Sequence, residues 1–173
     1  MKLTISISSK QYIRYYLLAF LLSPFLLIQA QETVQITSIF SVNSFPIINN
    51  NKAAIIYIDS SDAPVVTVAA RAFQQDVELI SNVKPLLNFT QKNVTSLPII
   101  IGTRNHSKLV DQLVENGKLS TVTIDGKWES FIITVIKNPL PNVPQALVIV
   151  GSDARGTAFG VFEVSKQMGV SPW

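Results

Sequence analysis

The sequence predicts an α/β (α+β) domain, with a mixed β-sheet that contains a βαβ unit and a β-hairpin and has two to three helices packed on it. Three observations lead to this fold class. Short apolar runs rich in β-forming residues recur along the chain, a segment with helical periodicity separates the first two of them, and an alternating segment surrounds Asp125-Gly126. From these elements we expect a sheet of roughly four to six strands in residues 31–173.

The first thirty residues have the features of an export signal. Lys2, Lys10 and Arg14 precede the apolar segment LLAFLLSPFLLIQA, which ends on the small residue Ala30 and contains no acidic residue. This apolar run is shorter than the roughly 20 residues that a membrane-spanning helix needs. We therefore expect residues 1–30 to be a signal peptide that is cleaved near Ala30, which leaves an exported protein without a stable membrane anchor. The alternative is an uncleaved anchor.

Charge and cysteine content exclude several classes of function. The chain has 14 Lys and Arg against 11 Asp and Glu, but three of the basic residues and none of the acidic ones lie in the predicted signal. The remaining chain therefore has 11 of each and no formal net charge, which does not favour nucleic acid as a partner. The chain has no cysteine, so disulfides, thiol catalysis and cysteine-anchored lipidation are excluded.

The first half of the predicted domain is a strand, a loop, and a strand–helix–strand unit. Residues 33–40, TVQITSIF, are a candidate first strand, and the turn-rich segment 41–51 is a predicted loop. Residues 52–59, KAAIIYID, and 97–103, LPIIIGT, predict two buried strands. Because a helical segment separates them, we expect a βαβ unit with parallel strands.

The helix of this unit is predicted from Ala63 to Ile80. Apolar residues recur there at spacings of three and four, which places them on one stripe: Val66, Ala69, Phe73, Val77 and Ile80. Asp62 is a candidate cap for the free amides of the first helical turn, and Pro64 needs no amide partner at that position.

The second half of the chain predicts a further helix, a hairpin, a strand and a last helix. HSKLVDQLVENGK predicts a short helix that ends near Gly117. Asp125-Gly126 predicts a β-hairpin within STVTIDGKWESFIITVI, because both residues accept a positive φ. A proline-rich loop, residues 138–144, is expected to lead into the strand Ala146–Val150. The last helix is predicted from about Arg155 to Met168.

A glycine-rich corner connects the last strand to the last helix. Gly151 and Gly156 have the spacing of a phosphate-binding loop, but Thr157 and Ala158 stand where such a loop has a lysine and a hydroxyl residue. We therefore predict no nucleotide and no other cofactor. The interpretation that we favour is structural: Gly151 and Gly156 allow a tight turn, and Gly156 and Gly160 give the helix a flat face that lies close to the sheet.

Two charged residues complete this corner. Asp153 is expected to cap the amides of the last helix, and Arg155 is expected to pair with Asp153 or with a neighbouring carbonyl. The alternative is that Asp153 or Arg155 contacts a ligand at one rim of a cleft.

Candidate catalytic and metal-binding residues are scarce. His106 is the only histidine, no G-x-S-x-G occurs, and the acidic residues form no evident pair, so we predict no catalytic residue and no metal site. His106 is expected to be an exposed turn residue. Trp128 is expected to pack across the predicted hairpin, and stacking on a sugar ring is the alternative.

Residues from the corner to the last tryptophan follow a family pattern. The pattern G-S-D-x-R-G-T-x-Y-G-x-Y, followed by a helix and G-V-S-P-W, is matched except that Phe159 and Phe162 replace tyrosines and lose their hydroxyls. Three further stretches fit: DSSDAPVVTVAARAFQQDVE, IIIGT and GKLSTVTIDGKWESFIITVIKNPLP. Over roughly Lys52 to Trp173 the chain resembles the N-terminal domain of glycoside hydrolase family 115, the xylan α-1,2-glucuronidases.

The resemblance implies that residues 31–173 are an accessory α/β domain of an exported, inverting glycosidase that removes (4-O-methyl)glucuronic acid from glucuronoxylan. It implies that residues 169–173 begin the linker to a (β/α)₈ barrel, which carries the catalytic residues and contacts Trp173. Because the family pattern continues past S-P-W into that barrel, the chain looks like the first domain of a truncated protein whose full-length form binds glucuronoxylan or a related uronic-acid-bearing polysaccharide. No catalytic residue carries over to this chain. The alternatives are a stand-alone carbohydrate-binding or accessory module and the N-terminal domain of a hexosaminidase-like glycosidase.

Overall fold

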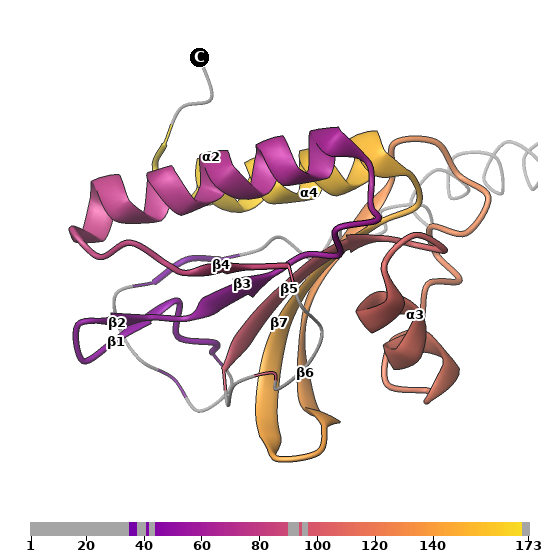
Figure 1. The fold of residues 1–173 in the computed structure, drawn as a ribbon, viewed down its shortest axis with the longest axis horizontal. Coiled ribbons are helices and arrows are strands. Elements are labelled where there is room, and N and C mark those ends of the chain that lie inside the picture. The colour runs from indigo at the N-terminus through magenta and orange to yellow at the C-terminus, as the bar shows by residue number, and fades with distance from the viewer. Residues whose placement is uncertain (1–34, 38–40, 42–43, 90–93, 95–96, 171–173) are drawn as a thin grey trace, which may run out of the picture. The chain divides into compact units, whose positions relative to one another are not determined.

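The computed structural model describes residues 35–37, 41, 44–89, 94 and 97–170 (Figure 1). The predicted signal peptide, residues 1–30, and Trp173 lie outside the described residues, as does most of the candidate strand 33–40. The part of that strand that is described, residues 35–37, is not in a strand. Within the described ranges, no helix is both long and apolar enough to cross a membrane.

The predicted mixed sheet is confirmed, with five strands in the order β4-β3-β5-β7-β6. Strands β4, β3, β5 and β7 are parallel to one another, and the edge strand β6 pairs antiparallel with β7. Their bounds are β3 Ile55–Tyr57, β4 Leu87–Asn88, β5 Pro98–Thr103, β6 Phe131–Leu140 and β7 Val143–Gly151. A small separate hairpin precedes them, formed by β1 Ile48–Asn49 and β2 Lys52–Ala53.

Three helices cover the sheet in the described part of the chain. Helices α2, Pro64–Ser81, and α4, Ala154–Gln167, lie side by side on one face, and α3, Lys108–Glu115, lies on the other (Figure 1). Successive residues of each strand alternate between these two faces. In β5, for example, Ile99 and Ile101 pack toward α2 and α4, while Ile100 packs toward α3. Burial on both faces explains why the central strands are continuous apolar runs.

The predicted βαβ unit is confirmed, but the chain forms an additional strand, β4, between α2 and β5 that the sequence did not predict. Strands β3 and β5 are parallel neighbours, and α2 is one residue shifted from the predicted span at each end. Four of the five predicted stripe residues are buried in α2, whereas Ile80 is half exposed in its last turn. The helix ends at Asn82, whose φ of 56° is left-handed and whose amide donates to the carbonyl of Glu78.

The hairpin predicted at Asp125-Gly126 is wrong, because that segment is a series of turns. The amides of Ile124 and Asp125 both donate to the carbonyl of Thr121. Ile124 is buried against the α3 side of the sheet, which draws the segment inward instead of extending it. Only Gly126 of the dipeptide has a positive φ, whereas a tight hairpin turn of that kind needs it at both residues.

The hairpin at this side of the sheet is instead formed by β6 and β7, through the segment predicted as a proline-rich loop. Pro141 and Asn142 make the turn, and Asn142 has a φ of 62°. A register shift between Lys137 and Leu140 accommodates Pro139, which has no amide to donate and lies in an edge strand.

Candidate functional site

Loops from several strands meet at the carboxyl edge of the parallel sheet, where open α/β sheets bind their ligands. Loops 59–63, 104–107 and 152–153 follow β3, β5 and β7. Because β6 is antiparallel and begins opposite the end of β7, the preceding loop 121–130 reaches the same edge. This edge is therefore the candidate site of the domain.

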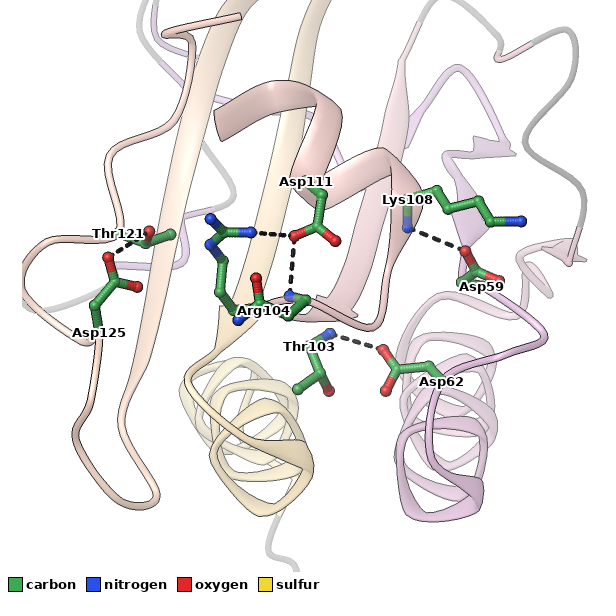
Figure 2. A network of polar contacts seen from close by, with 9 residues as sticks. Asp59, Asp62, Thr103, Arg104, Lys108, Asp111, Thr121 and Asp125 are labelled. Atoms are coloured by element: carbon green, nitrogen blue, oxygen red, sulfur yellow. Dashed lines mark hydrogen bonds and ion pairs between the residues drawn. The ribbon is translucent and has the colours of Figure 1, made fainter. Parts of the chain in front are cut away.

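Two aspartates lie in the loop after β3, next to the end of β5. The helices that follow these strands, α2 and α3, go to opposite faces of the sheet, which makes the junction of β3 and β5 the switch point of the fold. Figure 2 shows Asp59 and Asp62 there, directed at α3 and at the end of β5. Both carboxylates come from the loop after β3 and are almost fully buried.

Asp62 ties the start of α2 to the neighbouring strand. Its Oδ2 accepts a hydrogen bond from the amide of Thr103 at 2.7 Å, and its Oδ1 accepts one from the amide of Ala63 at 2.8 Å. The prediction that Asp62 caps the first turn of α2 is wrong, because Ala63 holds the cap position and has no side-chain cap bond. The carboxylate is drawn across the sheet to β5 instead.

Asp59 binds the first amide of α3. Its Oδ2 accepts a hydrogen bond from the Lys108 amide at 3.1 Å, and its Oδ1 accepts bonds from the amide and hydroxyl of Ser61 at 3.0 and 2.8 Å. The amino-terminal end of a helix attracts anions, because its first amides lack partners and its dipole is positive there. At α3 a carboxylate of this chain already holds that position.

The loop after β5 is fixed in the same way. The guanidinium of Arg104 pairs with the carboxylate of Asp111 in α3, which also accepts the Asn105 amide at 2.9 Å (Figure 2). His106 is exposed in this turn, as the sequence predicts, and its carbonyl accepts a bond from the hydroxyl of Ser61 at 3.4 Å. The charged side chain of this loop, Arg104, is thus paired with a carboxylate of the helix that follows it.

The glycine corner is closely packed. A Cβ at Gly151 would collide with the backbone amide of Thr157, and one at Gly156 would collide with the carbonyl of Ser130. At Gly160 the nearest atom to such a Cβ is Cγ2 of Ile149, at 2.9 Å. The three glycines therefore let α4 lie directly against β7 and the loop before β6.

Thr157 continues this packing into the sheet. Its hydroxyl lies 2.9 Å from the hydroxyl of Thr103, 3.3 Å from the carbonyl of Gly102 and 3.0 Å from the carbonyl of Asp153. Thr157 stands where a phosphate-binding loop has its lysine, and here a short, fully buried side chain joins α4 to β5.

Asp153 caps α4, as the sequence predicts, and also fixes a second segment. Its Oδ1 accepts the amide of Gly156 at 2.7 Å, and its Oδ2 accepts the amide of Glu129 at 2.8 Å. The hydrogen bond from the Glu129 amide, followed by that from Gly156, lowers the pKa of Asp153 below its ordinary value of 3.8. The carboxylate is therefore an ionised structural acceptor at neutral pH.

Arg155 does not form the predicted pair with Asp153 or with a carbonyl. Its guanidinium lies 3.1 Å from the carboxylate of Glu129, and its side chain is 68% exposed. The same guanidinium lies over the ring of Phe159, with its central carbon 5.9 Å from the ring centroid. Asp153 already accepts hydrogen bonds from two backbone amides, and the Arg155 side chain pairs with Glu129 instead.

Trp128 does not pack across a hairpin. It lies in the loop before β6 and is 85% exposed, because the predicted hairpin does not exist and the strand begins only at Phe131. Among the described residues it is the most exposed of the large apolar side chains.

No group of three or more His, Asp or Glu side chains that could hold a metal ion occurs within the part of the chain described. An open depression of about 670 Å³ lies away from the carboxyl edge, around the β6–β7 turn. It is lined by backbone and side chains of the turn, residues 138–144, together with Asn116 and Lys118. The lysine there is its single charged lining residue, so no acid–base pair lines it.

Similarity to known proteins is found among solved structures. No protein-family model matches the chain, and no curated protein matches it. Among solved structures, it is similar to a family GH115 4-O-methyl-α-glucuronidase with specificity for decorated arabinogalactans. The TM-score is 0.55 at 27% sequence identity, and the similarity covers 69% of this chain and 14% of that chain.

The chain thus has the fold of a glycoside hydrolase-related domain and corresponds to a small part of that glucuronidase. Sequence reasoning missed the roles of Asp59 and Glu129 and assigned Asp62 to the wrong partner, as a cap of α2. The aspartates carried a usable signal, because acidic residues directly after a buried strand lie at the carboxyl edge of a parallel sheet. Glu129 carried no such signal, because its partners depend on where the loop before β6 ends.

Proposed function

We propose that this chain supplies a non-catalytic N-terminal domain to an exported glycoside hydrolase that removes (4-O-methyl)glucuronic acid from a polysaccharide such as glucuronoxylan. The domain supports a catalytic barrel through its packed α/β core, and it does not itself cleave the glycosidic bond. Both the sequence pattern and the similarity to part of a GH115 glucuronidase support this assignment.

One observation carries the non-catalytic role. The carboxyl edge of the sheet is where a catalytic α/β domain holds its ligand, and here carboxylates of the chain occupy the backbone amides of that edge. Asp59, Asp62 and Asp153 each accept at least two hydrogen bonds from this chain. A glycosidase needs one carboxyl group to donate a proton and a second to activate water or attack the sugar. These three carboxylates are already engaged as structural acceptors.

Export and polysaccharide binding are further parts of the proposal. Export depends on the predicted signal peptide at residues 1–30, and it predicts a mature protein that begins at Gln31. N-terminal sequencing of the secreted protein tests this part directly, because an uncleaved anchor would leave the protein in the membrane with Met1 at its start.

The catalytic part is tested by measuring uronic acid release. The purified chain is incubated with glucuronoxylan and, separately, with glucuronic-acid-decorated arabinogalactan, next to a family GH115 glucuronidase as the positive control. We expect release of (4-O-methyl)glucuronic acid by the control enzyme and none by the chain. Release by the chain that follows its concentration and survives repurification would contradict the non-catalytic role.

The coding sequence downstream of the Trp173 codon provides an independent test. The proposal predicts an open frame that alternates strand and helix patterns, as a (β/α)₈ barrel requires. A protein expressed from that longer frame should release the uronic acid that the shorter chain does not release. A longer protein that cleaves hexosaminides and not uronosides would instead favour the hexosaminidase-like alternative.

A further inference from the structure

Trp128 stands out because a large aromatic side chain is held in solvent by a well-ordered support. Tryptophan is among the most buried residue types on average, and its exposure leaves a large apolar surface in water. The loop that carries it has access to the core, since Ile124 in the same loop is only 3% exposed. The fold therefore buries one apolar residue of this loop and leaves Trp128 outside at 85% exposure.

The backbone on the C-terminal side of Trp128 is fixed by several hydrogen bonds to side chains and backbone. The Glu129 amide donates to Asp153 at 2.8 Å, and the Ser130 amide donates to the hydroxyl of Ser152 at 3.1 Å. The Ser152 amide donates to the carbonyl of Ser130 at 2.8 Å, and the Ser130 hydroxyl donates to the carbonyl of Trp128 at 3.0 Å. A ligand that contacts a support of this kind orders little new backbone on binding.

The residues that flank Trp128 in the sequence are charged. Lys127 is exposed, and Glu129 pairs with Arg155, whose side chain is 68% exposed. Protein-docking surfaces have a broad apolar centre built from several adjoining side chains. In the described loop 121–130, the large exposed apolar side chains are Trp128 and Val122 alone. A sugar ring fits the arrangement better, because it has an apolar C–H face for an aromatic ring and a rim of groups for charged side chains.

We propose that Trp128 is a stacking platform for a pyranose ring, and that Arg155 binds the carboxylate of a uronic acid on the same oligosaccharide. This inference rests on the proposed function, since it names the substrate-binding contribution of the domain to a uronic-acid-removing glycosidase. Glu129 orients the Arg155 guanidinium through the 3.1 Å contact and leaves its remaining N–H groups for the ligand.

The test uses the complete chain with Trp173→Phe, so that Trp128 is the single tryptophan and reports its own surroundings by fluorescence. Three probes are titrated: xylo-oligosaccharides that carry 4-O-methylglucuronic acid, the same oligosaccharides without it, and free 4-O-methylglucuronic acid. We expect Trp128 fluorescence to change with both oligosaccharides and the acidic one to bind at least threefold more tightly. Binding to the variants is measured by calorimetry, which needs no tryptophan.

Trp128→Ala should weaken binding of both oligosaccharides at least tenfold, and Trp128→Phe should retain part of the affinity. Arg155→Gln should remove the preference for the acidic oligosaccharide and leave binding of the neutral one unchanged. Arg71→Gln is the matched control, because Arg71 is an exposed arginine of α2 that lies over another phenylalanine, Phe89. This variant should change neither affinity. Thermal unfolding of each variant confirms that it is folded.

Binding that is absent, or equally strong in Trp128→Ala, would overturn the proposal. Equal affinity for acidic and neutral oligosaccharides in the unchanged chain would overturn the role of Arg155. These outcomes differ from a failure of the proposed function. If the longer protein releases uronic acid while the chain binds no saccharide, the inference fails and the proposed function stands. If saccharide binds at Trp128 and the longer protein has no glycosidase activity, the proposed function fails.

Discussion

Helices α4 and α3 both begin at the carboxyl edge of the sheet, but a different kind of residue completes each start. The first amides of α4 are bound by Asp153, which directly precedes the helix in sequence. The first amide of α3 is bound by Asp59, which comes from another loop 49 residues earlier. One start is a local motif, whereas the other exists only after β3 and β5 have paired. The comparison separates what short-range sequence specifies from what the assembled sheet supplies.

Gly156→Ala should have the largest effect on this comparison, because it attacks the local start through packing. The new Cβ would meet the carbonyl of Ser130, which is held by its own hydrogen bonds and has little room to shift. We expect a loss of about 3 kcal/mol in the free energy of unfolding, measured by urea denaturation.

Gly160→Ala is the matched control on the same helix. Its Cβ would meet Cγ2 of Ile149 at 2.9 Å, which is a milder clash than the one with the backbone carbonyl at Gly156, and alanine also has the higher helix propensity. The loss should therefore be smaller than that of Gly156→Ala. Equal losses for the two variants would show that close packing at the corner is not the reason for Gly156.

Asp62→Ala tests the long-range ties of the edge. It removes the acceptor of the Thr103 amide, which is buried in β5, and that amide gains no replacement partner in the chain. We expect a loss of about 2 kcal/mol in unfolding free energy. Asp125→Ala, at an exposed turn with a single 3.2 Å bond to Thr121, should cost less than about 0.5 kcal/mol. A similar cost at both positions would contradict a special role for the buried carboxylate.

Asp153→Asn tests the local cap and its dependence on pH. Asparagine keeps one acceptor oxygen and loses the other, so we expect a loss of about 1 kcal/mol at pH 7. Because the pKa of Asp153 is lowered in the folded chain, its ionised form stabilises the fold above its ordinary pKa of 3.8. This stabilisation is lost as the pH falls below that value, through the lower pKa of the folded state. The stability difference between the variant and the unchanged chain in urea denaturation should therefore shrink as the pH falls below 3.8, and a constant difference would contradict the assignment.

Arg155→Gln should have the smallest effect on stability. The ion pair with Glu129 is largely exposed, and such pairs contribute little because water and salt screen them. We expect a change below about 0.5 kcal/mol in urea denaturation at physiological ionic strength. A loss as large as that of Gly156→Ala would mean that Arg155 holds the corner, as its place in the sequence pattern first indicated.

The contrast between local and long-range features also explains which predictions succeeded. The α2 and α4 spans, the βαβ unit and the Asp153 cap depend on periodicity or on neighbouring residues, and the structure confirms them. The hairpin at Asp125-Gly126 failed although its turn signal is strong. Burial of Ile124 by the other elements outweighs the preference of the dipeptide, and no short window of sequence contains that competition.

The candidate site shows the same division. The close approach of α4 to the sheet at Gly156 and Gly160 agrees with the prediction of a flat helix face. Gly151 was predicted for its freedom in a tight turn, whereas the structure requires it because a Cβ there would collide with the Thr157 amide. Trp128 was misplaced because its assignment assumed a hairpin that does not form, and Arg155 was misplaced because its assignment considered only partners within the corner. Their actual surroundings follow from Glu129, whose φ of 51° turns the chain just before β6. An unfavourable backbone angle at a glutamate has no sequence signal and is stabilised here by the bond from its amide to Asp153.

The two hydrogen bonds that the Asp153 carboxylate accepts have a consequence for motion in the native state. One carboxylate holds both the first turn of α4 and the Glu129 amide, so neither segment is released without weakening the other. The loop before β6 and the start of α4 therefore form one cooperative opening unit, which hydrogen exchange would report as matched protection of the Glu129 and Gly156 amides.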